Sequence, residues 1–328
     1  MIGLFDSFQR PINYLRVSLT DRCNLRCMYC VPSDGVHLLP HQDILTYEEI
    51  YTIVKAAAEL GINKIRITGG EPLVRLAVPE LVQMLARIIG IDDISLTTNG
   101  ILLGRYAAEL KSAGLHRVNV SLDTLKQDKV NLITRCGGSL NDVLKGIKVA
   151  ESVGLNPVKL NMVVMSGIND DELLDFAAKT INEGWHVRFI EFMPFTSEGD
   201  ITPQFISVSN MKKRIKQLGE LEPCLPNIGN GPAKYFRFPQ AKGTIGFITP
   251  VSEHFCFQCN RLRLTADGKL RLCLLSEDEI DMKQPLRNGI SPPELKKLIA
   301  QAVARKPLRH NLAEGYVPKD RTFGQVGG

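Results

Sequence analysis

The chain has no hydrophobic run long enough to cross a membrane. None of its apolar stretches approaches the roughly 18–20 residues that a transmembrane helix needs. Residues 1–13 also lack a basic segment followed by an apolar one, so we expect no signal peptide. Both absences argue against a membrane protein and against secretion.

The chain also has only a small excess of positive over negative charge and very little tryptophan. The formal net charge is +5 over 328 residues, the chain has one Trp, and no long block of Lys or Arg occurs. A modest positive charge permits an anionic substrate but does not predict a nucleic-acid partner. No Ser/His/Asp set and no pair of catalytic carboxylates stands out, so the sequence does not indicate simple hydrolytic chemistry.

What the chain does have is clustered cysteine. Six of its eight cysteines fall into two tight groups, and Cys136 and Cys224 stand alone. Without an export signal, such groups favour metal binding in a reducing compartment over disulfides, so we expect a cytoplasmic protein. Cys23, Cys27 and Cys30 would present three thiolates, which suit an iron–sulfur cluster or zinc. Three thiolates leave one iron of a [4Fe–4S] cluster free to bind a small molecule.

Short β-rich runs alternate with longer helical patterns from Tyr14 to about Leu218. The predicted strands are Leu15–Leu19, Lys64–Thr68, Asp93–Thr98, Arg117–Leu122, Val158–Met165 and His186–Phe192. The predicted helices are Tyr47–Leu60, Glu80–Ile89, Ala107–Ala113, Asp142–Val153, Asp170–Asn182 and Asn210–Leu218. Thr46 and Glu49 predict a capping box at the first helix. Such units predict an α/β fold with parallel strands and right-handed crossovers. About six units are fewer than the eight of a closed barrel, and an open doubly wound sheet is the competing topology.

The composition changes around Pro223–Pro232, where Pro, Asn and Gly accumulate. This predicts a linker, and therefore two regions, residues 1–222 and residues 223–328. The second region carries the other cysteine group. Its tail, from Glu314 onward, is polar and Gly-rich, and we expect it to be loosely held.

The second cysteine group frames a predicted β-hairpin. Cys256 and Cys259 are followed by Cys273, and residues 261–272 alternate around a central Asp-Gly turn signal. A three-residue loop over residues 266–268 would pair Leu264 with Leu270 and Leu262 with Leu272.

This register places charged residues together on the other face of the hairpin. Arg261, Arg263 and Arg271 would share that face with Cys273. Like charges opposite each other are unfavourable unless an anion lies between them, and arginine forks suit phosphate oxygens. The pattern indicates a metal beside a phosphate site. A structural zinc site that adds His254 to the three cysteines is the alternative.

Two motifs carry a resemblance to a known superfamily. The spacing Cys-x₃-Cys-x₂-Cys, with Tyr29 before the third cysteine, resembles the signature of the radical S-adenosylmethionine (SAM) enzymes. The string Thr68-Gly69-Gly70-Glu71-Pro72 looks like their motif for the SAM amino group. The resemblance implies that the open iron binds SAM and that reduction then yields a 5′-deoxyadenosyl radical.

Further strings narrow the resemblance to the GTP 3′,8-cyclase family. They are residues 16–24, Thr97-Thr98-Asn99-Gly100, residues 119–123, Phe192-Met193-Pro194, the second cysteine group and the terminal Gly327-Gly328. The resemblance implies an incomplete, TIM-like (βα)₆ barrel whose C-terminal extension carries a second [4Fe–4S] cluster. One cluster would lie at each end of a central cavity.

The resemblance also implies roles for individual residues. The first cluster would be held by Cys23, Cys27 and Cys30, and the second by Cys256, Cys259 and Cys273. SAM would contact Tyr29, Gly70, Ser121 and Met193. GTP would contact Arg16, Arg66, Thr97, Lys159, Arg261, Leu262 and Arg263. Gly70, Thr97, Ser121 and Met193 fall at or near the carboxyl ends of predicted strands, where barrel active sites form. Lys159 instead sits near the beginning of its predicted strand, so its assignment rests on the resemblance alone.

The implied reaction opens molybdenum cofactor biosynthesis. The radical would remove the ribose C3′ hydrogen of GTP, and C3′ would then bond to C8 of the guanine. Arg16, Arg261 and Arg263 would assist the later proton and electron transfer. The implied partners are GTP, a flavodoxin- or ferredoxin-like electron donor, and cyclic pyranopterin monophosphate synthase, which receives the product. We also expect a homodimer and neither a nucleic-acid nor a membrane partner.

Several alternatives remain open from the sequence. One is a radical SAM enzyme that modifies peptides or proteins and has an auxiliary cluster, although such enzymes usually carry more C-terminal cysteines. Another is a zinc-stabilised nucleic-acid-binding protein. The Gly-Gly terminus fits a frayed end or an arm inserted near the active site; a thiocarboxylate carrier would need a much smaller domain.

Overall fold

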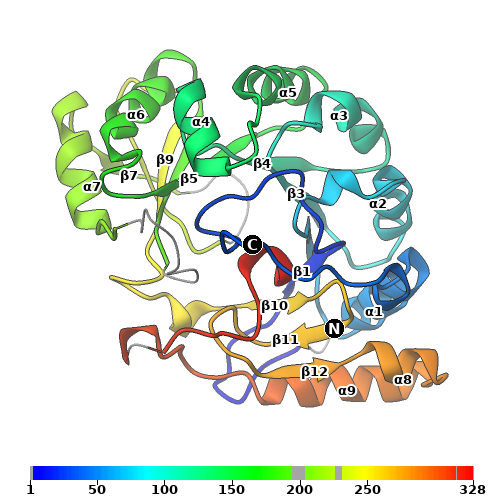
Figure 1. The fold of residues 1–328 in the computed structure, drawn as a ribbon. Helices are drawn as coiled ribbons and strands as arrows, with labels where there is room; N and C mark the ends of the chain where they lie inside the picture. Colours follow the sequence, from blue (N-terminus) through cyan, green and yellow to red (C-terminus); the bar gives the residue numbers. More distant parts are fainter. Residues whose placement is uncertain (1–2, 194–203, 226–230, 315, 328) are drawn as a thin grey trace.

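The computed structural model describes residues 3–193, 204–225, 231–314 and 316–327. Its centre is a run of six parallel strands with helices on their outer side (Figure 1). These strands are β1 Tyr14–Ser18, β2 Lys64–Thr68, β3 Asp93–Thr98, β4 Arg117–Ser121, β5 Lys159–Val164 and β6 His186–Glu191. The α-helices that follow them are α1 Tyr47–Glu59, α2 Val78–Ala86, α3 Leu103–Ser112, α4 Gln127–Thr134, α5 Leu140–Ser152, α6 Leu173–Asn182 and α7 Val208–Ile215.

The six strands agree with their predicted bounds to within one residue at each end. The predicted capping box is present, because the Thr46 side chain accepts from the Glu49 N–H and the Glu49 side chain accepts from the Thr46 N–H. Helix bounds are less accurate: α3 begins four residues before the predicted Ala107, and α4 was not predicted. The last predicted turn of α7 is a separate 3₁₀ turn, Lys216–Leu218.

Strands from the C-terminal region extend the sheet at both edges. They are β7 Glu222–Pro223, β8 Lys234–Arg237, β9 Thr244–Ile248, β10 Arg261–Leu264, β11 Lys269–Arg271 and β12 Glu279–Asp281. β9 lies parallel to β6, and β10 lies parallel to β1. The order is β12-β11-β10-β1-β2-β3-β4-β5-β6-β9-β8-β7, so the described strands form one open sheet. The prediction of an incomplete α/β barrel is confirmed; the boundary between residues 222 and 223 stays a prediction.

The hairpin of β10 and β11 has the predicted register. Leu264 is paired with Leu270, and Arg263 with Arg271. The Thr265 N–H donates to the Lys269 carbonyl (2.9 Å), which closes a loop of three residues. Gly268 ends that loop at φ +80°, a left-handed conformation that glycine adopts without strain.

Helices α8 Lys283–Arg287 and α9 Pro292–Ala304 complete the C-terminal region, and α9 packs beside α1. The main core lies between the sheet and the outer helices and consists mostly of buried Leu, Ile, Val and Ala side chains, with several Phe and Met. No helix among the described residues is both long and apolar enough to span a bilayer.

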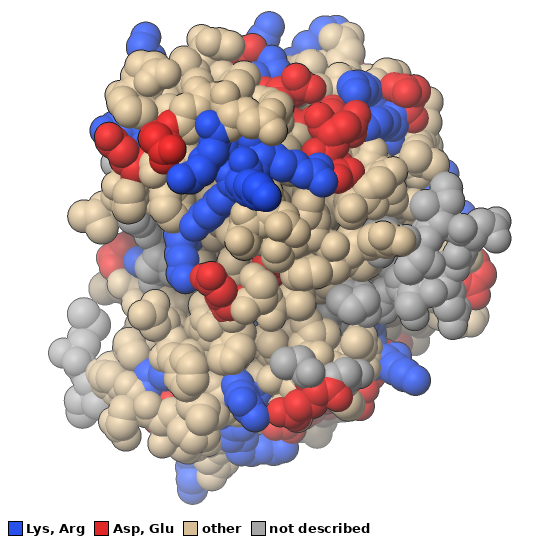
Figure 2. All heavy atoms as spheres, turned by 90° about the vertical axis from the view of Figure 1, so that its left-hand side faces the viewer, with Lys and Arg blue, Asp and Glu red and all other residues tan. Residues whose placement is uncertain are grey.

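One face of the molecule gathers Lys and Arg side chains (Figure 2). It is the side of Figure 1 on which α6 and α7 lie. The last turn of α7 carries Lys212, Lys213 and Arg214. Arg214 pairs with Asp170 (2.7 Å), and the Lys212 ammonium lies 4.0 Å from the centre of the Phe236 ring. Much of this positive charge is therefore engaged within the chain.

The C-terminal tail is not loosely held as predicted. It runs into the centre of the barrel, where the end of the ribbon lies in Figure 1. A 3₁₀ turn over Phe323–Gln325 is closed by a capping box between Thr322 and Gln325, and Val326 is only 1% exposed. Gly328 lies outside the described residues.

Candidate active site

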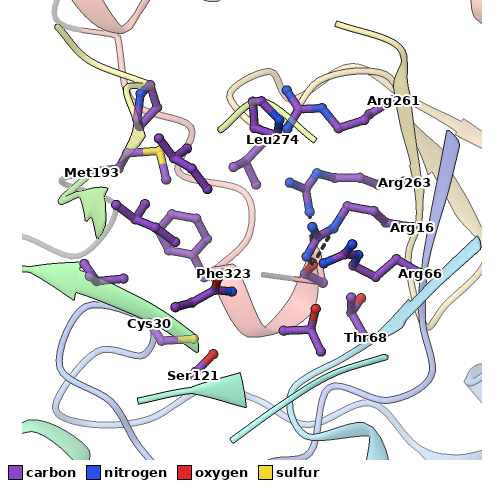
Figure 3. A pocket seen from close by; sticks show the side chains of 18 of the residues that line it. Arg16, Cys30, Arg66, Thr68, Ser121, Met193, Arg261, Arg263, Leu274 and Phe323 are labelled. Atoms are coloured by element: carbon purple, nitrogen blue, oxygen red, sulfur yellow. Dashed lines mark hydrogen bonds between the residues drawn. The ribbon is translucent and has the colours of Figure 1, made fainter. Parts of the chain in front are cut away.

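A cavity of about 310 Å³ is lined by residues from both the amino and the carboxyl ends of the parallel strands. All six clustered cysteines line it. Of the other predicted contact residues, those that line it are Arg16, Tyr29, Arg66, Gly70, Thr97, Ser121, Met193, Arg261 and Arg263. Figure 3 shows Cys30, Ser121 and Met193 on one side of this cavity and the arginines on the other.

Two predicted GTP contacts do not line the cavity. The Leu262 side chain is 1% exposed and belongs to the hydrophobic core, because alternation along β10 turns it away from the arginines. Only its backbone is left to face a ligand. Lys159 is at the start of β5 and is 7% exposed, with its ammonium 5.6 Å from the centre of the Tyr235 ring.

The first cysteine group lies on the loop after β1. The Cys30 N–H donates to the Cys27 carbonyl (2.8 Å), which folds the loop back on itself. Burial raises the pKa of the Cys23 thiol to about 11 and that of Cys30 to about 12, while a hydrogen bond from the Gly324 backbone lowers the latter. Buried free thiolates are therefore disfavoured, so metal ions must displace the thiol protons when they bind.

The Gly-Gly-Glu segment packs directly against this loop. The Gly70 N–H donates to the Thr20 carbonyl (2.7 Å), and the Glu71 N–H donates to the Arg22 carbonyl (2.8 Å). A Cβ on Gly70 would lie 2.4 Å from the Arg22 oxygen, so no other residue fits without moving the backbone. Glycine here positions the cysteine loop as well as leaving room for a ligand.

Glu71 ties the same segment to β3. Its carboxylate accepts hydrogen bonds from the Thr98 hydroxyl (2.8 Å) and from the Asn99 N–H (2.7 Å). Burial raises the pKa of Glu71 to about 7, although these hydrogen bonds lower it. Asn99 in turn lies within 4.0 Å of the Cys23 sulfur, so β2, β3 and the cysteine loop form one connected unit.

Tyr29 is held by a residue that the sequence reasoning did not assign to the site. Its hydroxyl donates to Asp123 Oδ2 (2.8 Å), and Asp123 Oδ1 accepts from the Val163 N–H (2.8 Å). Burial raises the pKa of Asp123 to about 6, while both hydrogen bonds lower it. The aromatic ring beside Cys30 is thus fixed from strands β4 and β5.

Three arginines form a row across neighbouring strands. Arg16 on β1 is the register partner of both Arg263 on β10 and Arg66 on β2. Figure 3 shows the three side chains projecting in the same direction, with Arg261 beyond them. Burial and then the charge of Arg263 lower the pKa of Arg16 well below its usual value, and burial and Arg261 lower that of Arg263 to about 10. Such a row of like charges, two of them buried and Arg16 partly buried, favours an anionic ligand.

The tail contacts the same row. The carbonyl oxygen of Gly327 accepts from Arg16 (2.8 Å) and from Arg263 (3.0 Å). At the first cysteine group, a Cβ on Gly324 would lie 3.8 Å from the Cys30 sulfur. Residues 324 and 327 therefore line the cavity. Of the interpretations offered for the Gly-Gly terminus, this agrees with an arm inserted near the active site and not with a frayed end.

Four buried polar atoms of residues that line this cavity have no hydrogen-bond partner within the part of the chain that the structure describes. They are Arg66 Nε, Thr97 Oγ1, Asn161 Oδ1 and Arg188 Nε. Buried polar groups are normally paired, so unpaired donors and acceptors that line one cavity indicate a polar ligand. Sequence reasoning missed Asn161 and Arg188, which are register partners on β5 and β6. The sequence signal that could have identified them is a polar residue in the middle of a predicted strand whose neighbouring residues are apolar.

The second cysteine group surrounds the base of the hairpin. Arg10, 5% exposed, donates to the carbonyl of Cys256 (2.7 Å) and pairs with Asp6 (2.6 Å). The Arg261 guanidinium lies 3.5 Å from the Cys259 sulfur. Burial raises the pKa of the Cys259 thiol, but the charges of Arg261 and Lys306 outweigh this and bring it to about 6.

Arg271 is not available as a phosphate ligand. It is register partner to Arg263, as predicted, but its guanidinium binds Asp320 (2.6 Å) and Glu279 (2.8 Å) and it does not line the cavity. Two carboxylates of this chain, and not a bound anion, relieve the repulsion across the hairpin.

The two cysteine groups lie at opposite ends of one β-ladder. The first group follows the carboxyl end of β1, whereas Cys259 precedes the amino end of β10, its parallel neighbour. Cys273 follows β11, which is antiparallel to β10, and therefore lies at the same end as Cys259. The ladder has four register pairs, from Tyr14–Arg261 to Val17–Leu264, and is about 10 Å long at ~3.3 Å per residue.

Each cysteine group fits an iron–sulfur cluster by its chemistry, because three soft sulfur donors face one cavity. Among the described residues, no three His, Cys, Asp or Glu side chains converge on a single metal position. Cysteines that hold a cubane each ligate a different iron, so they need not converge in this way.

The fold and the first family match define the class of the protein. Residues 17–179 match the Radical SAM superfamily. Streptococcus suis SuiB bound to its precursor peptide superimposes with a TM-score of 0.64 at 13% identity, over 92% of this chain and 67% of that one. The structure of anSMEcpe with bound AdoMet superimposes with a TM-score of 0.52 at 19% identity, over 63% of this chain and 58% of that one. The chain is a radical SAM enzyme, a class that uses a [4Fe–4S] cluster and SAM.

The full-length relatives identify the family. The GTP 3′,8-cyclases of Moorella thermoacetica and Pelotomaculum thermopropionicum are 52% and 53% identical to this chain, which covers 99% of each. Residues 185–312 match the family Molybdenum Cofactor Synthesis C. The chain belongs to the GTP 3′,8-cyclase family.

Proposed function

We propose that this chain converts GTP to (8S)-3′,8-cyclo-7,8-dihydroguanosine 5′-triphosphate, the first step of molybdenum cofactor biosynthesis. One observation carries the proposal: a single cavity has a cysteine triad at each end and a row of arginines between them. The triads suit two clusters with open irons, and the arginines suit a polyphosphate. The names of the full-length relatives support the same substrate.

The first triad, Cys23, Cys27 and Cys30, holds the cluster that binds SAM in this proposal. Bound there, SAM supplies a 5′-deoxyadenosyl radical on reduction. Gly70 leaves room for the ligand, Ser121 and Met193 line its side of the cavity, and Asp123 holds Tyr29 in place. Fixed walls matter because a primary carbon radical attacks almost any nearby C–H bond.

GTP lies between the two ends of the cavity. Its base faces the second triad, Cys256, Cys259 and Cys273, and its phosphates pair with the arginine row of Arg16, Arg66 and Arg263, with Arg261 beyond. Thr97, whose hydroxyl has no hydrogen-bond partner among the described residues, can give GTP a further hydrogen bond. The second triad thus anchors the base and the arginine row anchors the phosphates, so that the ribose C3′ hydrogen between them faces the first triad.

The arginines have a second role after hydrogen abstraction. Bond formation between C3′ and C8 leaves a radical that must gain an electron. Arg16, Arg261 and Arg263 place positive charge around the substrate, which favours arrival of that electron and stabilises the anionic product.

Metal analysis tests the two triads. Two full clusters give about eight irons per chain after anaerobic purification. About four irons together with one zinc would contradict a second cluster and support the structural zinc alternative. Zinc with negligible iron would contradict the proposal as a whole.

The activity test is anaerobic incubation of the reduced protein with SAM and GTP. The expected products are 5′-deoxyadenosine and an isomer of GTP, detected by mass analysis. 5′-Deoxyadenosine that forms equally with and without GTP, with no isomer, would contradict this substrate.

The partners follow from the reaction. A low-potential flavodoxin- or ferredoxin-like protein supplies electrons, and cyclic pyranopterin monophosphate synthase consumes the product. We further propose a homodimer. Binding measurements with each purified partner, and the mass of the protein in solution, test these proposals.

A further inference from the structure

Lys306 is a buried lysine at the second cysteine group. It follows α9, is 3% exposed and lines the cavity. Its ammonium donates to the carbonyl of Arg261 (2.9 Å) and to the carbonyl of Leu272. These carbonyls belong to the two arms of the hairpin at its base. Arg261 comes two residues after Cys259, and Leu272 comes directly before Cys273.

Lys306 differs in its partners from three other buried cations, Arg10, Arg271 and Lys283. Arg10 pairs with Asp6, Arg271 pairs with Asp320, and Lys283 lies 3.4 Å from Asp43. Over residues 3–193, 204–225, 231–314 and 316–327, no carboxylate lies within ion-pair distance of the Lys306 ammonium. A buried charge without a counter-ion is costly, so an anion is expected beside it.

The side chains of the second triad can supply this negative charge, because cysteines bind metal as thiolates. Lys306 binds the carbonyls of Arg261 and Leu272, which lie two residues from Cys259 and next to Cys273, and the side chains of the lysine and of both cysteines line the cavity. A cubane held by three thiolates carries net negative charge, and one-electron reduction increases that charge by one. A fixed cation beside the ligands therefore favours the reduced state.

We propose that Lys306 is a positioning residue of the second iron–sulfur cluster. Its ammonium joins the two arms that present Cys259 and Cys273, and its charge raises the reduction potential of the cluster. The electron comes from an external low-potential one-electron donor, no proton moves, and no bond to Lys306 forms or breaks. This inference rests on the proposed assignment of the second cluster.

The experiment compares Lys306→Met with Lys306→Arg in the full chain carrying both clusters. The midpoint potential is followed by electron paramagnetic resonance during anaerobic titration with dithionite. The second-cluster signal is the one that a Cys273→Ala chain lacks. Lys283→Met is the matched control, because Lys283 is also buried in the C-terminal region but pairs with Asp43.

We expect Lys306→Met to shift the second-cluster potential downward and to leave the first-cluster signal unchanged. Lys306→Arg and Lys283→Met should keep the parent potential. An unchanged potential in Lys306→Met overturns the proposal. If Lys306→Met fails to hold the second cluster, Lys306→Arg decides: a retained cluster supports the need for a cation, and a lost one overturns it.

Failure of the underlying assignment has a different signature. A parent chain whose signals are the same as those of Cys273→Ala has no second cluster at this triad, whatever Lys306 does. That result is obtained before any Lys306 variant is compared.

Discussion

Arg16 and Arg263 are register partners on two adjacent parallel strands, and both donate to one acceptor, the carbonyl oxygen of Gly327. Two guanidiniums side by side repel each other. The carbonyl dipole between them offsets part of that repulsion. The end of the chain therefore stabilises the charge row from within the cavity.

Gly327→Ala should release the tail. Gly327 has φ +75°, a conformation that costs alanine about 1 kcal/mol, and a Cβ there would lie 2.4 Å from the Thr68 hydroxyl oxygen. We expect faster proteolysis of the tail and at least a tenfold loss of cyclase product. Limited proteolysis with mass analysis, beside the activity assay, measures both effects.

Gly289→Ala is the control for this variant. Gly289 also has a left-handed backbone (φ +81°), but a Cβ there meets nothing within 4 Å. It should reproduce the backbone strain without freeing the tail. Equal protease resistance in Gly327→Ala and the parent chain would argue against a docked tail.

Arg263→Ala should separate hydrogen abstraction from cyclisation. The substitution removes one buried charge from the row while the first triad is left unaltered. We expect 5′-deoxyadenosine to continue to form while the cyclised product falls by roughly 10²-fold. Product analysis under single-turnover conditions tests this. If 5′-deoxyadenosine stops as well, Arg263 acts earlier, or in binding. Arg237→Ala, on the exposed face of β8, is the control.

The strands and the hairpin could be predicted because their signals are local. The alternation of Leu262, Leu264, Leu270 and Leu272 determines which face of the hairpin is buried, and the structure follows it. The same alternation already conflicted with a side-chain contact from Leu262 to GTP. A resemblance transfers a position but does not say whether the backbone or the side chain makes the contact.

The partners of Arg271 could not be predicted in this way. Asp320, which pairs with it, is 49 residues away in the sequence, on a tail that the composition suggested was loose. Local patterns do not report which distant carboxylate folds back onto a buried charge. The position of the tail, and which arginines are available to bind a ligand, therefore depend on tertiary contacts that the local sequence does not reveal.

Gly70→Ala should disrupt the first triad. The added Cβ would lie 2.4 Å from the Arg22 carbonyl oxygen, which also accepts the Glu71 N–H. Because both neighbours are backbone, the loop that carries Cys23 must move. We expect iron to fall from about eight to about four per chain, with loss of 5′-deoxyadenosine formation.

Gly104→Ala is the matched control. Gly104 lies in α3, and a Cβ there would make an ordinary contact of 3.6 Å with the Gly146 Cα of α5. Full iron content in Gly70→Ala would show that the loop tolerates the displacement.

Lys159 should make stability rise with pH. Burial, and then the charges of Arg188 and Arg117, lower its pKa to about 7, whereas the unfolded chain keeps an ordinary lysine. Between about pH 7 and 10 the unfolded state binds more protons, so raising the pH favours the folded state. From pH 7 to 9 the parent chain should gain about 2 kcal/mol relative to Lys159→Met. Anaerobic urea unfolding measures the difference; parallel pH profiles for the two chains would show that the Lys159 pKa is not lowered.

The pairing of β1 with β10 has a consequence for which molecules can react. Each residue of an extended strand advances the chain by about 3.3 Å, so the four register pairs set the separation of the two sulfur triads along the ladder. Under the proposed function, a nucleotide long enough to span this separation reaches both clusters, whereas we expect a free base or a short phosphate ester to reach only one. The length of two paired strands is then expected to be one determinant of which substrates react.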